Sequence, residues 1–319
     1  MVRPLLQDRK ILITGGAGFI GANLLRKLVS IPNFKVFVIE KRNTDLWRIK
    51  DIANKISIKY VDLEDFNGLS KVVHDIKPQI VFHLASYGVY PSFQNDLRKM
   101  AGTNIEGALN LIDLLKNCPI SSFVNIGTCF AYKEKKSKLN ENNFTDPLNF
   151  YAATKLAAEL LLKKFAVENN MPVINLRLFT PYGYYEDTRR LIPYTILNAL
   201  KNKKIELSSP NYVRDFIFIE DVTDLFLRII KSNHNYRGEI FNIGSGKQYS
   251  IKNIVSVVEK LLHKKLDVVY KVRASYYNEP AFMIADNAKA RAAFNWGINY
   301  SIESGIAKTI DWLKKNYEI

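Results

Sequence analysis

Tyr151 and Lys155 stand four residues apart in a segment with helical periodicity, so their side chains share one face of a helix. A phenol with an ordinary pKa of about 10 is a poor base at neutral pH, but a neighbouring ammonium stabilises its phenolate form. Thr128 ends an earlier strand-like run, and its hydroxyl can hydrogen-bond the same oxygen of a bound molecule. The three residues predict hydride transfer at a carbinol or ketone, in which Tyr151 moves the proton and Thr128 orients the oxygen.

A Tyr-x-x-x-Lys pair also arises by chance on helices, so its weight depends on a glycine-rich turn near the N-terminus. Residues 11–21 place an apolar run before this turn, which then opens a helical segment. The spacing fits both G-x-G-x-x-G and its three-spaced variant, and the helix N-terminus can hold a pyrophosphate. The predicted contacts are Gly15, Gly18, Phe19, Ile20 and Gly21. The two patterns together predict a dinucleotide enzyme, with Lys155 also holding the nicotinamide ribose.

Glu40 ends the second strand-like run, 19 residues after Gly21. An acidic side chain there can accept hydrogen bonds from the adenosine ribose and repel a 2′-phosphate, which favours NAD. Lys41 and Arg42 follow directly, and a guanidinium can hold a 2′-phosphate. The alternative is that both are solvated loop charges. The sequence therefore predicts NAD or NADP, with NAD favoured.

Strand-like and helical segments alternate through the first half of the chain. The strands are expected at 10–14, 35–40, 56–63, 79–86, 121–128 and 172–179, and the helices at 19–30, 67–76, 98–117 and 150–169. This alternation predicts an α/β fold, a Rossmann-type doubly wound parallel sheet. After residue 179 the segments are shorter and richer in turns, including one at 180–183. Residues 180–319 are therefore expected to form a smaller interleaved C-terminal α/β lobe for the substrate, beside a cofactor-binding and catalytic domain at 1–179.

The elements expected in the second half are fewer. Strands are predicted at 214–219, 239–243 and 266–270, and helices at 191–200, 221–230, 251–262 and 302–316. Some of these strands are expected to return to the main sheet.

Composition excludes several classes of protein. The net charge is +15, but the lysines are spread along the chain and no nucleic-acid-binding module is visible, so no nucleic-acid partner is expected. No apolar run reaches the length of a membrane span. Two cysteines and four scattered histidines predict neither a disulfide framework nor a metal site. No signal peptide is visible, and a cytoplasmic protein is expected.

The chain resembles the extended short-chain dehydrogenase/reductases of the NAD-dependent epimerase/dehydratase family, which act on nucleotide sugars. The resemblance rests on residues 14–21, 61–63, 83–85, 151–155, 214–222 and 285–290. It implies that Asp62 and Leu63 flank the adenine. It also implies that the segment Leu84, Ala85 and Ser86 lines the path to the nicotinamide, and that Asn104 braces the active-site helices.

The same resemblance implies a nucleotide-diphosphate sugar as the substrate. Arg214 matches the arginine that grips the diphosphate, with an ion pair to Asp215 as the alternative. Leu191 is expected beside the base, and Arg273 is a second candidate phosphate contact. Thr180 stands where many relatives have an asparagine, and the segment from Tyr87 resembles 4-ketoreductases that make CDP-linked dideoxyhexoses. The substrate contacts implied are Tyr87, Thr128, Thr180, Leu191, Arg214 and Arg273.

Cys129 and Phe130 follow Thr128, where the family's 4,6-dehydratases carry Asp-Glu. Neither residue can donate a proton for elimination of water, so dehydration is set aside. Reduction of an NDP-4-keto-6-deoxyhexose is preferred, with NDP-sugar 4-epimerisation on retained NAD as the alternative. A non-catalytic cofactor-binding regulator or scaffold is the remote third reading.

The family usually forms homodimers through a four-helix bundle. The candidate helices are 98–117 and 150–169, and both are rich in small residues: Ala101, Gly102, Gly107, Ala108, Ala152, Ala153, Ala157 and Ala158. Packing inside one subunit explains these small residues equally well.

Overall fold

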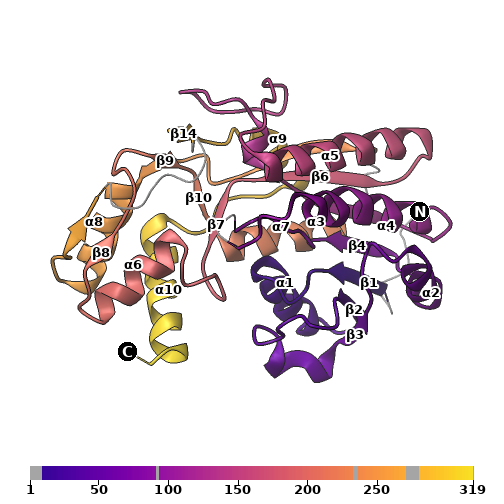
Figure 1. Cartoon of the computed structure of the whole chain (residues 1–319), viewed down its shortest axis with the longest axis horizontal. Coiled ribbons are helices and arrows are strands. Elements are labelled where there is room, and N and C mark those ends of the chain that lie inside the picture. The colour runs from indigo at the N-terminus through magenta and orange to yellow at the C-terminus, as the bar shows by residue number, and fades with distance from the viewer. Residues whose placement is uncertain (1–8, 91–92, 233–235, 271–279, 319) are drawn as a thin grey trace. The chain divides into compact units, whose positions relative to one another are not determined.

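The central sheet dominates the computed structural model, which describes residues 9–90, 93–232, 236–270 and 280–318 of the chain. Seven strands lie in the order β11–β6–β5–β4–β1–β2–β3, of which β4, β1, β2 and β3 can be followed in Figure 1. Their bounds are β1 Arg9–Thr14, β2 Phe34–Glu40, β3 Ser57–Tyr60, β4 Ile80–His83, β5 Ser122–Thr128, β6 Val173–Leu178 and β11 Glu239–Ile243. The pairs β1–β2, β1–β4, β2–β3 and β4–β5 are parallel. The predicted Rossmann-type sheet is confirmed, and its strand order reverses beside β1, where such sheets bind ligands.

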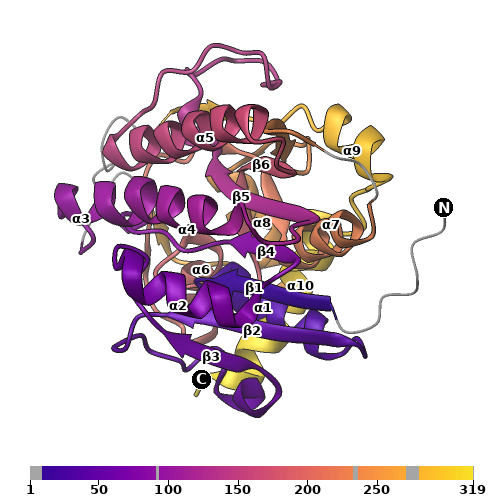
Figure 2. The same ribbon diagram turned by 90° about the vertical axis from the view of Figure 1, so that its right-hand side faces the viewer.

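Helices cover both faces of this sheet. On one face, α2 (Phe66–Ile76), α4 (Gly107–Leu115) and α5 (Phe150–Glu168) share an apolar cluster with Val81 of β4 (Figure 2). The ring of Phe82, the next residue of β4, packs against the ring of Phe226 of α7 (Ile219–Lys231), with 5.2 Å between the ring centroids. Because neighbouring residues of a strand point to opposite faces, α7 belongs to the other face. Burial on both sides explains why these strands are apolar throughout.

The segment predicted as one helix at 98–117 is interrupted. It consists of α3 (Leu97–Ala101), a π-helical segment (Gly102–Glu106) and α4. Side chains added at Gly102 and Gly107 would overlap Glu64 and Leu63 of the loop after β3. This close approach of a distant loop, which the local periodicity does not contain, accompanies the wider π turn.

The chain folds into two compact units, each made of several separate stretches of sequence. Unit 1 comprises Met1–Ala131, Asn149–Arg177 and Phe226–Phe241, and unit 2 comprises Tyr132–Leu148, Leu178–Leu225 and Asn242–Ile319. The division of ligand-binding roles at residue 179 stays a prediction.

The remaining elements are short strands and helices. The strands are β7 Thr180–Tyr182, β8 Ile205–Glu206, β9 Val213–Arg214, β10 Phe216–Phe218, β12 Tyr249–Ser250, β13 Val268–Val269 and β14 Phe282–Met283. The helices are α1 Phe19–Val29, α6 Leu191–Leu200, α8 Ile251–Leu262, α9 Ala288–Phe294 and α10 Ile302–Asn316, with 3-10 turns at Lys50–Lys55 and Cys129–Ala131. Helices α6, α8 and α10 have the predicted bounds. Ser250 and Ser301 cap α8 and α10, as their residue types favour.

Two expectations in unit 2 are wrong. The strand predicted at 214–219 is divided at Asp215, whose buried carboxylate accepts hydrogen bonds from Ser245, Gly246 and Ala285. The turn predicted at 180–183 begins as strand β7, because residues 180–182 pair in parallel with β10. Both features depend on interactions between distant parts of the sequence.

Candidate cofactor and catalytic site

The glycine turn between β1 and α1 has the geometry that the pattern predicts. Gly15 has φ +71°, and a Cβ there would lie 2.7 Å from the backbone nitrogen of Ala85. A Cβ at Gly21 would lie 2.5 Å from the Gly15 carbonyl oxygen, so the helix can approach the turn closely only without a side chain. Gly18 is the N-cap of α1, and the helix begins at Phe19 and Ile20. Its first N–H groups have no side-chain cap at Gly18, which suits a pyrophosphate.

Glu40 faces this turn from the end of β2. Its Oε1 accepts a hydrogen bond of 2.7 Å from the backbone N–H of Ala17. Burial raises the pKa of Glu40, and the bonds from Ala17 and Thr44 partly offset that effect. A buried carboxylate at this strand end fits the ribose of NAD, since a carboxylate can accept several hydrogen bonds. Arg42 is exposed.

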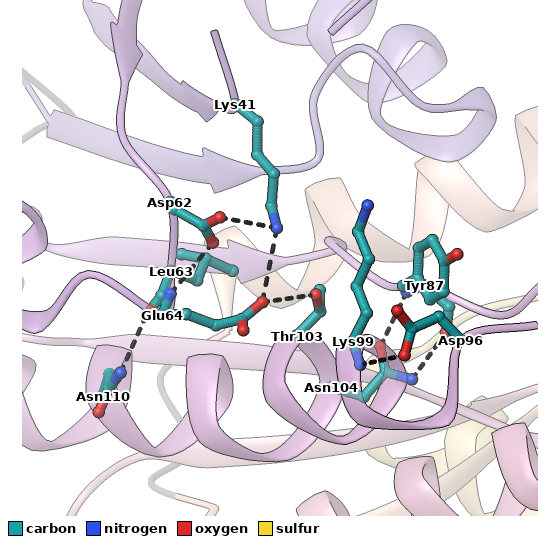
Figure 3. A network of polar contacts seen from close by, with 10 residues as sticks. All are labelled: Lys41, Asp62, Leu63, Glu64, Tyr87, Asp96, Lys99, Thr103, Asn104 and Asn110. Carbon is teal, nitrogen blue, oxygen red and sulfur yellow. Dashed lines mark hydrogen bonds and ion pairs between the residues drawn. The ribbon is translucent and has the colours of Figure 1, made fainter. Parts of the chain in front are cut away.

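Lys41 does not extend as an isolated loop charge. Its ammonium lies 2.9 Å from Oδ2 of Asp62 and 3.5 Å from Oε1 of Glu64 (Figure 3). Leu63 is buried, and its carbonyl accepts a hydrogen bond from Asn110 of α4. The structure therefore brings together Lys41, Asp62 and Leu63, three of the predicted cofactor contacts at the edge of the sheet.

β4 ends at His83, three residues before the predicted end, so Leu84, Ala85 and Ser86 lie in the following loop. The hydroxyl of Thr14 lies 2.8 Å from Nδ1 of His83 and accepts a 3.3 Å bond from the N–H of Ala85. Burial, and then repulsion by Lys155, lowers the pKa of His83 to about 3. His83 is therefore neutral at physiological pH and fixes the loop beside the glycine turn.

Asn104, in the π-helical segment, connects this loop to α5. Its carboxamide accepts a bond from the N–H of Tyr87 and donates to the carbonyl of Tyr87, both at 2.8 Å (Figure 3). It also donates to the hydroxyl of Thr154 at 2.9 Å, and that hydroxyl donates to the carbonyl of Tyr151. These contacts are of the kind that the predicted bracing role requires.

Tyr151 and Lys155 lie in the first turns of α5, which Asn149 caps by accepting a bond from Ala152. Tyr151 is half-buried and Lys155 is buried. Burial lowers the pKa of Lys155 to about 8, while the negative charge of Glu159 acts to raise it. Thr128 ends β5, as predicted, and its hydroxyl oxygen accepts a 3.2 Å bond from the N–H of Phe130. That bond uses a lone pair of the hydroxyl and not its proton.

The buried ion pair between Arg177 and Glu159, one helical turn after Lys155 on α5, was not predicted from the sequence. Arg177 of β6 donates two hydrogen bonds to Glu159, at 2.9 and 2.5 Å. Glu159 follows Lys155 by four residues, so the helical spacing that joined Tyr151 to Lys155 also identifies Glu159. Arg177 lies on another strand, and no local pattern points to it.

The predicted substrate contacts outside unit 1 are placed as follows. Arg214 on β9 is buried, and its Nη1 donates to the carbonyls of Val213 and Pro280 at 3.0 and 2.6 Å. Thr180 begins β7 and Leu191 begins α6. Arg273 lies outside the described residues.

No helix in the described ranges is long and apolar enough to cross a membrane. In the same ranges no three His, Cys, Asp or Glu side chains are grouped to hold a metal ion.

Comparison with known proteins agrees with this geometry. Residues 11–244 match the model of the NAD dependent epimerase/dehydratase family. UDP-glucuronate 4-epimerase of Thermodesulfobacterium geofontis is 29% identical, covering 97% of each chain. Human dTDP-D-glucose 4,6-dehydratase is 26% identical, covering 97% of this chain and 91% of its own. The crystal structure of UDP-glucuronic acid 4-epimerase from Bacillus cereus with UDP-glucuronic acid and NAD superimposes with a TM-score of 0.88, 28% identity and coverage of 97% and 100%.

Proposed function

Because this chain belongs to the NAD dependent epimerase/dehydratase family and is an NAD-dependent enzyme, we propose that it inverts C4 of a nucleotide-activated sugar. On the sequence alone, 4-keto reduction is the preferred reaction and 4-epimerisation the alternative. Similarity over nearly the whole chain to UDP-glucuronate 4-epimerases favours the alternative. The product and substrate then differ only in configuration, and the cofactor leaves the cycle unchanged.

The residues after Thr128 favour an epimerase over a dehydratase. Cys129 is buried in the 3-10 turn that follows β5. Elimination of water needs a side chain that protonates the leaving hydroxide. Where the family's 4,6-dehydratases carry Asp-Glu, this chain has a buried thiol, Cys129, and Phe130, which has no acidic proton, so the carboxylic acid is absent. Epimerisation needs only one proton-transferring group at the C4 oxygen, and Tyr151 meets that need.

The roles of the residues follow from their chemistry. The glycine turn and Glu40 would hold NAD, which would supply a hydride acceptor at C4 of the sugar; inversion requires that the 4-keto sugar turn to present its opposite face before the hydride is returned. Tyr151 removes the proton of the C4 hydroxyl as the hydride leaves and gives it back when the hydride returns. The ammonium of Lys155 stabilises the phenolate. The Thr128 hydroxyl donates a hydrogen bond to the C4 oxygen while its own oxygen accepts a hydrogen bond from the Phe130 N–H.

The proposed nucleotide-sugar contacts among the described residues of unit 2 are Arg214, Thr180 and Leu191, and Arg273 stays a further proposed contact from the sequence. The two bonds from Arg214 to backbone carbonyls orient its guanidinium without neutralising its charge. An oriented guanidinium suits the paired oxygens of a diphosphate. Tyr87, held by Asn104 in unit 1, is the further proposed contact.

We propose that the assembled enzyme is a homodimer. Leu160, Leu161 and Val167 of α5 are 53%, 42% and 58% exposed, and Leu160 follows Ala153 and Ala157 along one helical stripe. Four of the small residues suggested for the interface, namely Gly107, Ala108, Ala152 and Ala158, are instead buried inside unit 1. The larger apolar side chains therefore form the face offered to a second copy.

One experiment separates the two reactions. The purified enzyme is incubated with UDP-glucuronic acid, UDP-glucose and other UDP-, GDP- and CDP-sugars, and products are identified by NMR. A C4 epimer without added cofactor, together with NAD released on denaturation, supports the epimerase. Oxidation of NADH that is stoichiometric with an NDP-4-keto-6-deoxyhexose, with no epimer from any sugar, would establish the reductase instead.

A further inference from the structure

Lys41, the residue that follows Glu40, is bound by the acidic loop after β3. The ammonium of Lys41 lies between Asp62 and Glu64, 2.9 and 3.5 Å from their oxygens (Figure 3). The backbone N–H of Glu64 donates a 3.2 Å hydrogen bond to the Asp62 carboxylate. This bond within the loop helps to hold the Asp62 and Glu64 side chains in their positions beside Lys41. Lys41, the side chain that could bind a 2′-phosphate at the end of β2, is therefore paired with two negative charges.

Glu64 is held in place by the π-helical segment. Thr103, which is buried, donates a 3.0 Å hydrogen bond to the same Oε1 that faces Lys41. A side chain at Gly102 would overlap the Glu64 carboxylate. Glu64 thus lies against a glycine backbone with a hydroxyl aimed at it, and two residues of the interrupted helix position its charge.

We propose that Glu64 biases cofactor choice: together with Asp62 it holds Lys41 in an ion pair, which denies a 2′-phosphate its cation and favours NAD over NADP. NADP differs from NAD by a phosphate on the adenosine ribose, the ribose expected at Glu40. Proteins that accept this phosphate place a cation beside it. Lys41 adjoins Glu40 and has a flexible four-carbon stem, so it is a suitable cation once released.

The effect is expected to be moderate. Lys41, Asp62 and Glu64 are 39%, 42% and 34% exposed, and partly exposed ion pairs are weak. Releasing one such contact corresponds to about a fivefold change in a dissociation constant. Added salt should reduce the change, because exposed charges are screened.

The test measures binding and needs no turnover, so it stands apart from the proposed epimerisation. Enzyme freed of nucleotide by charcoal is titrated with 5′-ADP and with adenosine 2′,5′-bisphosphate in a calorimeter. The variants are Glu64→Gln, Lys41→Met and the double variant. Glu106→Gln is the matched control, since Glu106 is exposed at the end of the same π-helical segment. Retained affinity for 5′-ADP shows that each variant has a folded site.

Glu64→Gln should tighten the 2′,5′-bisphosphate about fivefold relative to 5′-ADP, while Glu106→Gln leaves the ratio unchanged. The double variant should return to the wild-type ratio, because the gain acts through Lys41. An unchanged ratio in Glu64→Gln would overturn the proposal. So would an equal gain in the double variant or in Glu106→Gln, because either result would assign the effect to net charge alone.

Discussion

Lys155 has the surroundings that set the working pH of the proposed catalysis. It is buried, with a pKa lowered to about 8, and the charged groups acting on it include Glu159, itself bound to Arg177. His83 also faces it, but its own pKa of about 3 leaves it neutral. A lysine must be protonated to stabilise the phenolate of Tyr151. Activity should therefore fall as the pH rises through about 8.

Replacing Glu159 should move this alkaline limit. Glu159→Gln removes the charge that raises the pKa of Lys155, so the limit in a pH profile of kcat should shift below 8. Glu168→Gln, at the exposed end of the same helix, should leave the limit in place. In the Glu159→Gln variant Arg177 loses a buried partner, which should cost about 3–5 kcal/mol of unfolding free energy. A folded Glu159→Gln enzyme with an unshifted limit would contradict the assignment.

Tyr151→Phe tests the proton transfer itself. Loss of the phenol should lower kcat by about a thousandfold or more, as for removal of an acid–base group. NAD binding, measured by calorimetry, should change little, because the ring remains. A variant that keeps near-full turnover would show that another group moves the proton.

At the scale of elements, local patterns predict the bounds of some helices, whereas other elements depend on distant interactions. Helices α6, α8 and α10 follow from their apolar periodicity and, in α8 and α10, from serine caps. Strand β7 and the π-helical segment do not, because each depends on a partner far along the chain. The site divides similarly. The glycine turn and the Tyr151–Lys155 pair can be predicted from the sequence. The Lys41 ion pair cannot, because it joins the loops after β2 and β3, and the Arg177 ion pair joins β6 to α5.

The segment between β7 and α6 contains a stability switch that the sequence did not reveal. Glu186 is buried, its Oε2 has no partner among the described residues, and burial raises its pKa to about 8. Its protonated form therefore stabilises the fold, and this contribution is lost as the pH rises from about 4.5 to about 8.

Glu186→Gln should remove this loss. The variant should match wild type near pH 4 and exceed its unfolding free energy by about 1–3 kcal/mol near pH 9, in denaturant titrations. Glu206→Gln, at an exposed position on β8, is the control and should show no such trend. A Glu186→Gln difference that is constant with pH would assign the effect to packing instead.

At the scale of the whole molecule, the exposed apolar stripe of α5 predicts the assembly state. A charge placed in a dimer interface loses its hydration without gaining a partner. Leu160→Glu should therefore convert a dimer to a monomer in light scattering at micromolar concentration. Leu97→Glu, at a position on α3 whose side chain is as exposed as Leu160, locates the edge of the interface. A wild-type protein that is monomeric at this concentration would refute the dimer.

The order in which the sheet takes its strands has a consequence for synthesis. β11, at one edge, comes from Glu239–Ile243, so about three quarters of the 319 residues must leave the ribosome before the sheet is complete. Until then, β6 offers an unpaired edge to any neighbouring chain. The nascent protein therefore passes through a stage in which its cofactor turn is already translated while its sheet is still open to aggregation.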